Sequence, residues 1–112
     1  MDLSKETERK IQDLQALESN LNTLLMQKQN YQVELNELTN ALGEVKKSEG
    51  DVYKVSSNIM IKANKPDVLK NLEEKKKMIE MKITSIEKQE TIFEDKASKI
   101  RTEVNTEITK NK

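Results

Sequence analysis

Side chains suited to acid–base or metal chemistry are of few kinds in this sequence. Histidine and cysteine are both absent, which removes the commonest general base, thiol nucleophiles, disulfides and the usual zinc ligands. Glu73 and Glu74 are adjacent carboxylates, and a carboxylate pair can act as general acid and base. Nothing around them indicates a concave site, so we interpret the pair as part of a solvated helix face. We therefore expect no enzyme activity, no catalytic residue and no metal site.

A phosphate-binding loop is also missing from the sequence. The only two glycines, Gly43 and Gly50, are not part of a GxxxxGK[ST] run, whose backbone amides would hold nucleotide phosphates. We expect no cofactor, and we expect the protein to act by binding.

The composition indicates long helices in place of an ordinary globular core. Of the 112 residues, 34% are hydrophobic, 3% aromatic and 36% charged, whereas globular domains are typically about 45–50% apolar. Twenty basic and twenty acidic residues cancel, so no general attraction to nucleic acid or to a membrane surface is expected. No apolar run approaches the roughly 18 residues of a membrane helix, and no signal-peptide core is present. These features predict a soluble, cytoplasmic protein.

The sequence predicts a first helix over residues 3–46, and Ser4 can cap its start. Its apolar residues recur at alternating spacings of three and four, as in a coiled-coil seam. The seam consists of Leu14, Leu17, Leu21, Leu24, Tyr31, Leu35, Leu38, Leu42 and Val45. Lys28 occupies one seam position and is interpreted as a polar residue that fixes the alignment; a buried charge acting as a switch is the alternative.

A second helix is predicted over residues 65–109. Asn64 and Asp67 can form a capping pair around Pro66 in the first turn. The seam residues are Leu72, Ile79, Ile83, Ile86, Phe93, Ala97, Ile100 and Val104. Folding back as an antiparallel coiled coil would bury both seams. In that alignment Lys28 lies one layer from Glu90, so the two seam charges can pair.

Polar residues replace the apolar seam near both chain ends. Thr7 and Lys10 continue the first seam line, and Glu107 continues the second. We expect the coiled coil to open or fray there, leaving nearby apolar residues partly exposed: Leu3, Ile11, Val104 and Ile108. Ordinary end fraying and an apolar grip for a partner are both open interpretations.

Residues 51–63, DVYKVSSNIMIKA, show an apolar period of two and predict a β-hairpin. We prefer a three-residue loop, 56–58, with Asn58 left-handed, because a two-residue loop would place Lys54 on the apolar face. The apolar side chains would then share one face: Tyr53, Val55, Ile59, Ile61 and Ala63. A lone hairpin is unstable in water, so we expect it to pair with hairpins of other chains in a closed barrel. Packing on its own helix roots is the alternative.

The runs that flank and include this hairpin resemble β-class prefoldin subunits, most of all archaeal ones. They are LLMQKQNYQVELNELTNAL, VYKVSSNIMIK and NKPDVLKNLEEKKKMIE, and the resemblance covers about residues 10–105. Ser57 departs from the family, which usually has glycine there; a left-handed residue at this position would imply a different loop.

The resemblance implies one domain over residues 1–112 and a mainly α fold, a two-helix coiled coil whose hairpins assemble into an intersubunit β-barrel. It also implies an ATP-independent holdase, an α2β4 hexamer with α-class subunits, nonnative client proteins and a group II chaperonin as partners. The implied assembly surface is Val52, Tyr53, Val55, Ile59 and Ile61. The implied client-binding residues are Leu3, Ile11, Val104 and Ile108. Weaker candidates for chaperonin contact are Glu103, Glu107 and Lys110.

Two other functions compete with this expectation. A coiled-coil scaffold would use the hairpin for oligomerisation and leave the coiled-coil tips inert. A nucleic-acid-binding arm of the synthetase type would need a basic tip, but Glu6 and Glu8 accompany Lys5 and Lys10 there.

Overall fold

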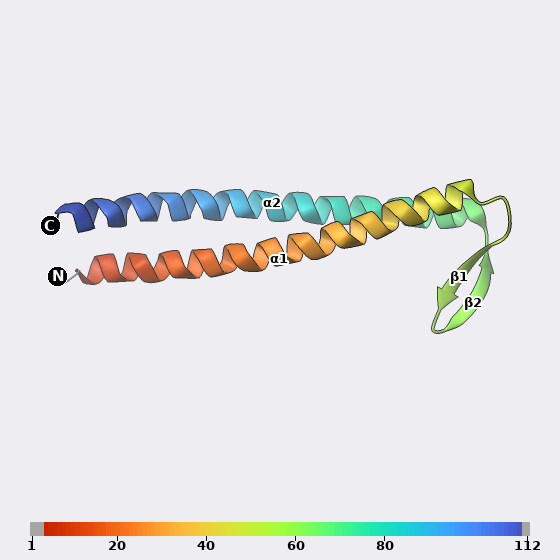
Figure 1. Cartoon of the computed structure of the whole chain (residues 1–112), viewed down its shortest axis with the longest axis horizontal. Coiled ribbons are helices and arrows are strands. Elements are labelled where there is room, and N and C mark those ends of the chain that lie inside the picture. The colour runs from red at the N-terminus through yellow and green to blue at the C-terminus, as the bar shows by residue number, and fades with distance from the viewer. Residues whose placement is uncertain (1–3, 111–112) are drawn as a thin grey trace. The chain divides into compact units, whose positions relative to one another are not determined.

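The computed structural model describes residues 4–110 and contains two long helices with a β-hairpin between them (Figure 1). Helix α1 covers Lys5–Lys47, strand β1 Val52–Ser56, strand β2 Ile59–Ala63 and helix α2 Lys65–Lys110. This order of elements confirms the expected mainly α fold of two long helices with one hairpin between them. The chain divides into two compact units, the terminal unit, Met1–Lys28 with Ser85–Lys112, and the hairpin unit, Gln29–Thr84.

Both helices begin at the predicted capping residues. The Thr7 amide donates to Ser4 Oγ at 3.1 Å, and the Asp67 amide donates to Asn64 Oδ1 at 3.4 Å. These bonds satisfy first-turn amides that have no partner within the helix. At the other end of α1, Lys65 Nζ lies 2.8 Å from the carbonyl oxygen of Ser48 and so joins the root of α2 to the end of α1.

The buried apolar side chains of the described residues all lie on the predicted seams. Leu24, Ile86, Ala97 and Val104 are buried in the terminal unit. Leu42, Ile79 and Ile83 are buried in the hairpin unit. Two packed helices can bury only one stripe each, which is why a sequence with so few hydrophobic residues suffices for this fold.

The hairpin loop has two residues, so the predicted three-residue loop is wrong. Ser56 pairs directly with Ile59, and Ser57 and Asn58 both have positive φ, 49° and 66°. Two left-handed residues form the type I′ turn, whose twist matches that of the paired strands. Ser57 is therefore left-handed, although the family usually has glycine at this position. As expected for a left-handed residue at position 57, the loop differs from the predicted three-residue loop.

The shorter loop changes which side chains share a face of the hairpin. Residues paired directly across an antiparallel ladder lie on the same face. One face carries Val52, Lys54, Ser56, Ile59, Ile61 and Ala63, and the other carries Tyr53, Val55, Met60 and Lys62. The prediction that Tyr53 and Val55 share a face with Ile59 and Ile61 is therefore wrong. It assumed that only one face is apolar, whereas the observed register gives both faces apolar side chains.

Candidate functional site

The hairpin exposes the largest cluster of apolar side chains on neighbouring residues in the described chain. Tyr53, Val55, Ile59, Met60 and Ile61 are each between 51% and 68% exposed. Val52, the remaining residue of the predicted assembly surface, is half-buried. Exposed apolar clusters of this kind mark sites of protein association, and in this single chain both edges of the two-stranded sheet are unpaired.

A groove of about 320 Å³ separates strand β1 from the first turns of α2 within the hairpin unit. Tyr53 lines its strand side, and Val68, Leu72 and Met78 line its helix side. The first part of α2 therefore approaches Tyr53 without covering it, since half of this residue is still exposed. Met60, which shares the face of Tyr53, is a surface residue that the sequence analysis missed because it assumed the longer loop.

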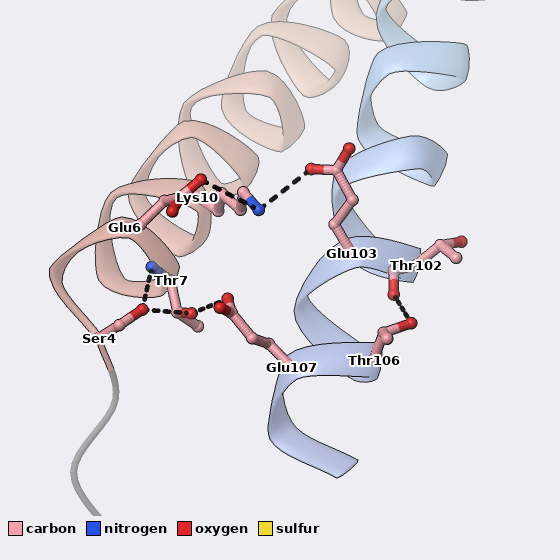
Figure 2. Close-up of polar contacts among 8 residues, drawn as sticks. All are labelled: Ser4, Glu6, Thr7, Lys10, Thr102, Glu103, Thr106 and Glu107. Atoms are coloured by element: carbon pink, nitrogen blue, oxygen red, sulfur yellow. Dashed lines mark hydrogen bonds and ion pairs between the residues drawn. The ribbon is translucent and has the colours of Figure 1, made fainter. Parts of the chain in front are cut away.

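The end of the terminal unit is joined by polar residues (Figure 2). Ser4 Oγ and Thr7 Oγ1 lie 2.9 Å apart, and Thr7 Oγ1 donates a hydrogen bond to Glu107 Oε2 on the other helix. Because the Thr7 hydroxyl proton is used by Glu107, Ser4 is the donor in the first bond. The Thr7 side chain is only 1% exposed.

A second polar contact lies one turn further along α1. Lys10 Nζ is 3.4 Å from Glu103 Oε2 and 3.7 Å from Glu6 Oε1. Desolvation lowers the pKa of Lys10, but attraction to Glu103, Glu6 and Glu107 outweighs it, so the pKa of Lys10 lies above its ordinary value. The lysine is therefore held in its charged form.

These contacts correct the expectation that the chain ends fray. Helix α1 is formed from Lys5 and helix α2 continues to Lys110. Val104 is 7% exposed, so the expectation that it is partly exposed is wrong. Ile11 and Ile108 are half-buried, and Leu3 lies outside the described residues. The polar seam residues are not gaps in the packing, because Thr7 bonds to Glu107 and Lys10 pairs with Glu103 across the two helices.

The predicted charged contact residues differ in their surroundings. Glu103 and Glu107 are engaged by Lys10 and Thr7 respectively. Lys110, in the last turn of α2, is exposed. Of the three, the Lys110 side chain makes no hydrogen bond or ion pair with another described residue.

The other polar seam pair was predicted correctly. Lys28 Nζ donates to Glu90 Oε1 at 2.8 Å, and both side chains are largely withdrawn from solvent. This hydrogen bond raises the pKa of Lys28 above its ordinary value; desolvation opposes the rise, and attraction to Glu90 and Glu87 adds to it. Between this pair and the chain ends, Arg101 lies 3.8 Å from Glu18, so the two helices of the terminal unit run antiparallel.

Residues 4–110 contain no group of three acidic side chains placed to hold a metal ion. Neither described helix has an apolar stretch that could cross a bilayer.

Comparison with known proteins identifies the family. The family model described as "Prefoldin subunit" matches residues 8–111. A prefoldin subunit beta of Pyrobaculum islandicum is 32% identical over 98 residues, which cover 86% of this chain and 78% of the relative. The prefoldin subunit beta of Methanospirillum hungatei is 30% identical over 108 residues, covering 95% and 90%.

A solved structure shows the same fold. The crystal structure of the prefoldin beta subunit from Thermococcus strain KS-1 aligns with a TM-score of 0.88 over 94% of both chains, at 23% identity. Two relatives at or above 30% identity, a family model spanning most of the chain and this shared fold agree with one another. The chain therefore belongs to the prefoldin subunit family, as a chaperone subunit of the β class.

Proposed function

We propose that this chain is a cytoplasmic β-class subunit of an α2β4 prefoldin hexamer. The hexamer holds nonnative proteins without ATP and passes them to a group II chaperonin. The observation that carries the proposal is the hairpin, whose apolar side chains are exposed on both faces. A single chain gains nothing from this exposure, but an assembly of hairpins would bury it.

The hairpin is the assembly surface in this proposal. Pairing the free edges of β1 and β2 with strands of other subunits closes a barrel without exposed edges. One face of each hairpin then points into the barrel. The other face packs against neighbouring subunits, so that assembly covers both faces: Val52, Ile59 and Ile61 lie on one face, and Tyr53, Val55 and Met60 lie on the other.

Clients bind at the terminal units of the assembled subunits. The residues proposed to contact clients are those that the family resemblance implies, Leu3, Ile11, Val104 and Ile108. Several weak contacts on separate arms retain a client through effective concentration, while each contact stays reversible. Glu103, Glu107 and Lys110 lie at the same end and are proposed to contact the chaperonin by charge.

A non-chaperone scaffold is the second candidate function. It is favoured by the burial of Val104 and the half-burial of Ile11 and Ile108, which leave little apolar surface at the end of the terminal unit. A scaffold would assemble through the same hairpin but would not protect a client.

The decisive experiment mixes this chain with an α-class prefoldin subunit and measures two quantities. Native mass spectrometry gives the stoichiometry, and light scattering gives the aggregation of a denatured enzyme diluted into the mixture. We expect a hexamer that suppresses aggregation without ATP. A hexamer that does not suppress aggregation would support the scaffold, and a persistent monomer would contradict both functions.

A matched pair of variants tests the hairpin directly. Val55→Glu with Met60→Glu places two charges on residues that pair across one hairpin face, and we expect the hexamer to be lost. Ile92→Glu, a similarly exposed apolar position on α2, is the control and should leave the mass unchanged.

A further inference from the structure

The seam layer nearest the chain ends is polar although it is closed. Thr7 occupies a seam position of α1, is 1% exposed and bonds to Glu107 on α2. Val104, the seam residue one step inward on α2, is 7% exposed. From this juxtaposition we propose that Ser4, Thr7, Lys10, Glu103 and Glu107 form a reversible polar latch that controls access to the apolar residues behind it.

The latch has two connected parts, both visible in Figure 2. In the first, Ser4 caps α1 through the Thr7 amide, donates to the Thr7 hydroxyl, and thereby orients that hydroxyl toward Glu107. In the second, Lys10 bridges Glu6 of its own helix and Glu103 of the opposite helix. Glu103 and Glu107 are one helical turn apart, so both bonds close the same end of α2 onto α1.

Because this seam layer is polar, the ends of α1 and α2 can separate easily in water. An apolar layer would lose buried area on opening and would resist separation in water. Thr7, Glu107, Lys10 and Glu103 can instead exchange their mutual bonds for bonds to water, so that the net gain from each intramolecular bond is small. The burial of Val104 stabilises the closed state. The polar contacts add little net stability, because water replaces them on opening, and they fix the alignment of α1 with α2.

Opening the latch exposes what a nonnative protein can bind. Val104 becomes accessible, and Ile11 and Ile108 lose the cover that keeps them half-buried. This part of the inference rests on the proposed client-binding function. Client binding then competes with latch closure. The apparent affinity for a client is proportional to the fraction of molecules in which the latch is open. In the closed state, the same end presents mainly charged and hydroxyl groups and offers a nonnative client little apolar surface.

The first experiment measures opening without any client. Spin labels on Arg9→Cys and Asn105→Cys, both at exposed positions, report the distance between the helix ends in the whole chain, which has no other cysteine. Thr7→Asp places a carboxylate opposite Glu107, at a position in the first helical turn where an acidic residue favours the helix. We expect the long-distance population to rise about three- to tenfold.

Two further variants decide between the latch and a general loss of structure. Thr106→Asp introduces the same charge one residue from Glu107, at a side chain that bonds only to its own helix through the Thr102 carbonyl, 2.9 Å away, and should leave the distances unchanged. Adding Glu107→Lys to Thr7→Asp restores an attractive pair and should restore the short distance. Equal distances for Thr7→Asp and Thr106→Asp would overturn the latch.

The second experiment connects the latch to client holding. Thr7→Cys and Glu107→Cys joined by a short bis-maleimide fix the ends together, and we expect aggregation suppression per subunit to fall at least fivefold against the same variant capped singly. The control link, Lys46→Cys with Glu73→Cys, joins two positions in the hairpin unit whose native side chains meet, with Lys46 Nζ 3.8 Å from Glu73 Oε1, and should leave holding intact. Full holding with fixed ends would refute gating, whereas absence of holding by the unlinked chain assembled with α-class subunits would refute the proposed function and leave the distance result standing.

Discussion

Lys28 and Glu90 form an ion pair of 2.8 Å on the seam of the terminal unit, at positions where the heptad pattern calls for apolar side chains. Each charge has its counter-charge on the other helix, so the pair is satisfied in only one alignment of α1 with α2. Replacing such pairs by apolar residues often leaves stability unchanged or raises it. The pair therefore acts on the alignment of the helices more than on their stability.

A double replacement tests this role in alignment. We expect Lys28→Leu with Glu90→Leu to keep or raise the melting temperature and to broaden the distances between spin labels placed on exposed positions of the two helices. Lys28→Glu alone should lower the melting temperature because it opposes two carboxylates, and adding Glu90→Lys should recover it. A single sharp distance in the double leucine variant would show that the apolar seam alone fixes the alignment.

The pair also gives a pH dependence whose sign follows from the raised pKa of Lys28. A lysine whose pKa is higher in the folded state contributes stability that is fully present below its unfolded value, 10.5, and is lost as the pH rises through the folded value. The free energy of unfolding, measured with urea, should therefore differ between the wild type and the double variant Lys28→Met/Glu90→Met by a constant amount from pH 7 to 9. Above about pH 10.5 the wild type should lose stability relative to the variant, and a difference that changes between pH 7 and 9 would contradict this assignment.

The two-residue turn predicts the effect of changing Ser57. A non-glycine residue in the left-handed region is strained by about 1–2 kcal/mol, and Ser57 has a φ of 49°. We expect Ser57→Gly to raise the free energy of unfolding by about 1 kcal/mol and Ser57→Val to lower it by a similar amount, as measured by thermal unfolding. Ser56→Gly, on a strand residue, should be destabilising; stabilisation by this control would contradict the observed register.

The seam of the hairpin unit predicts a large difference between two neighbouring positions of α2. Ile79 is 5% exposed and Met81 is 72% exposed. Truncation of a buried isoleucine to alanine costs about 2–5 kcal/mol, so Ile79→Ala should reduce the free energy of unfolding by that amount. Met81→Ala should change it by less than about 0.5 kcal/mol. Chemical denaturation of both variants at equal protein concentration provides the measurement.

The candidate sites were predictable to different degrees. The hairpin was located because a two-residue apolar period is visible in the sequence, and Lys28 and Glu90 were paired because both interrupt otherwise regular seams. Met60 was missed because the loop length was chosen to gather apolar residues on one face. Closure of the chain ends was missed because Thr7 and Glu107 were judged by their polarity alone, without a partner for either.

By itself, the sequence determined the order helix, hairpin, helix, the helix caps and the two seams. These features depend on local periodicity and on interactions between residues three or four apart. Both follow from the local sequence and do not require knowledge of the tertiary structure. Only the tertiary structure decided the two-residue turn, the two faces of the hairpin and the bond between Thr7 and Glu107, which are 100 residues apart. A hydroxyl and a carboxylate become a buried contact when two helices align them, and no local pattern contains that alignment.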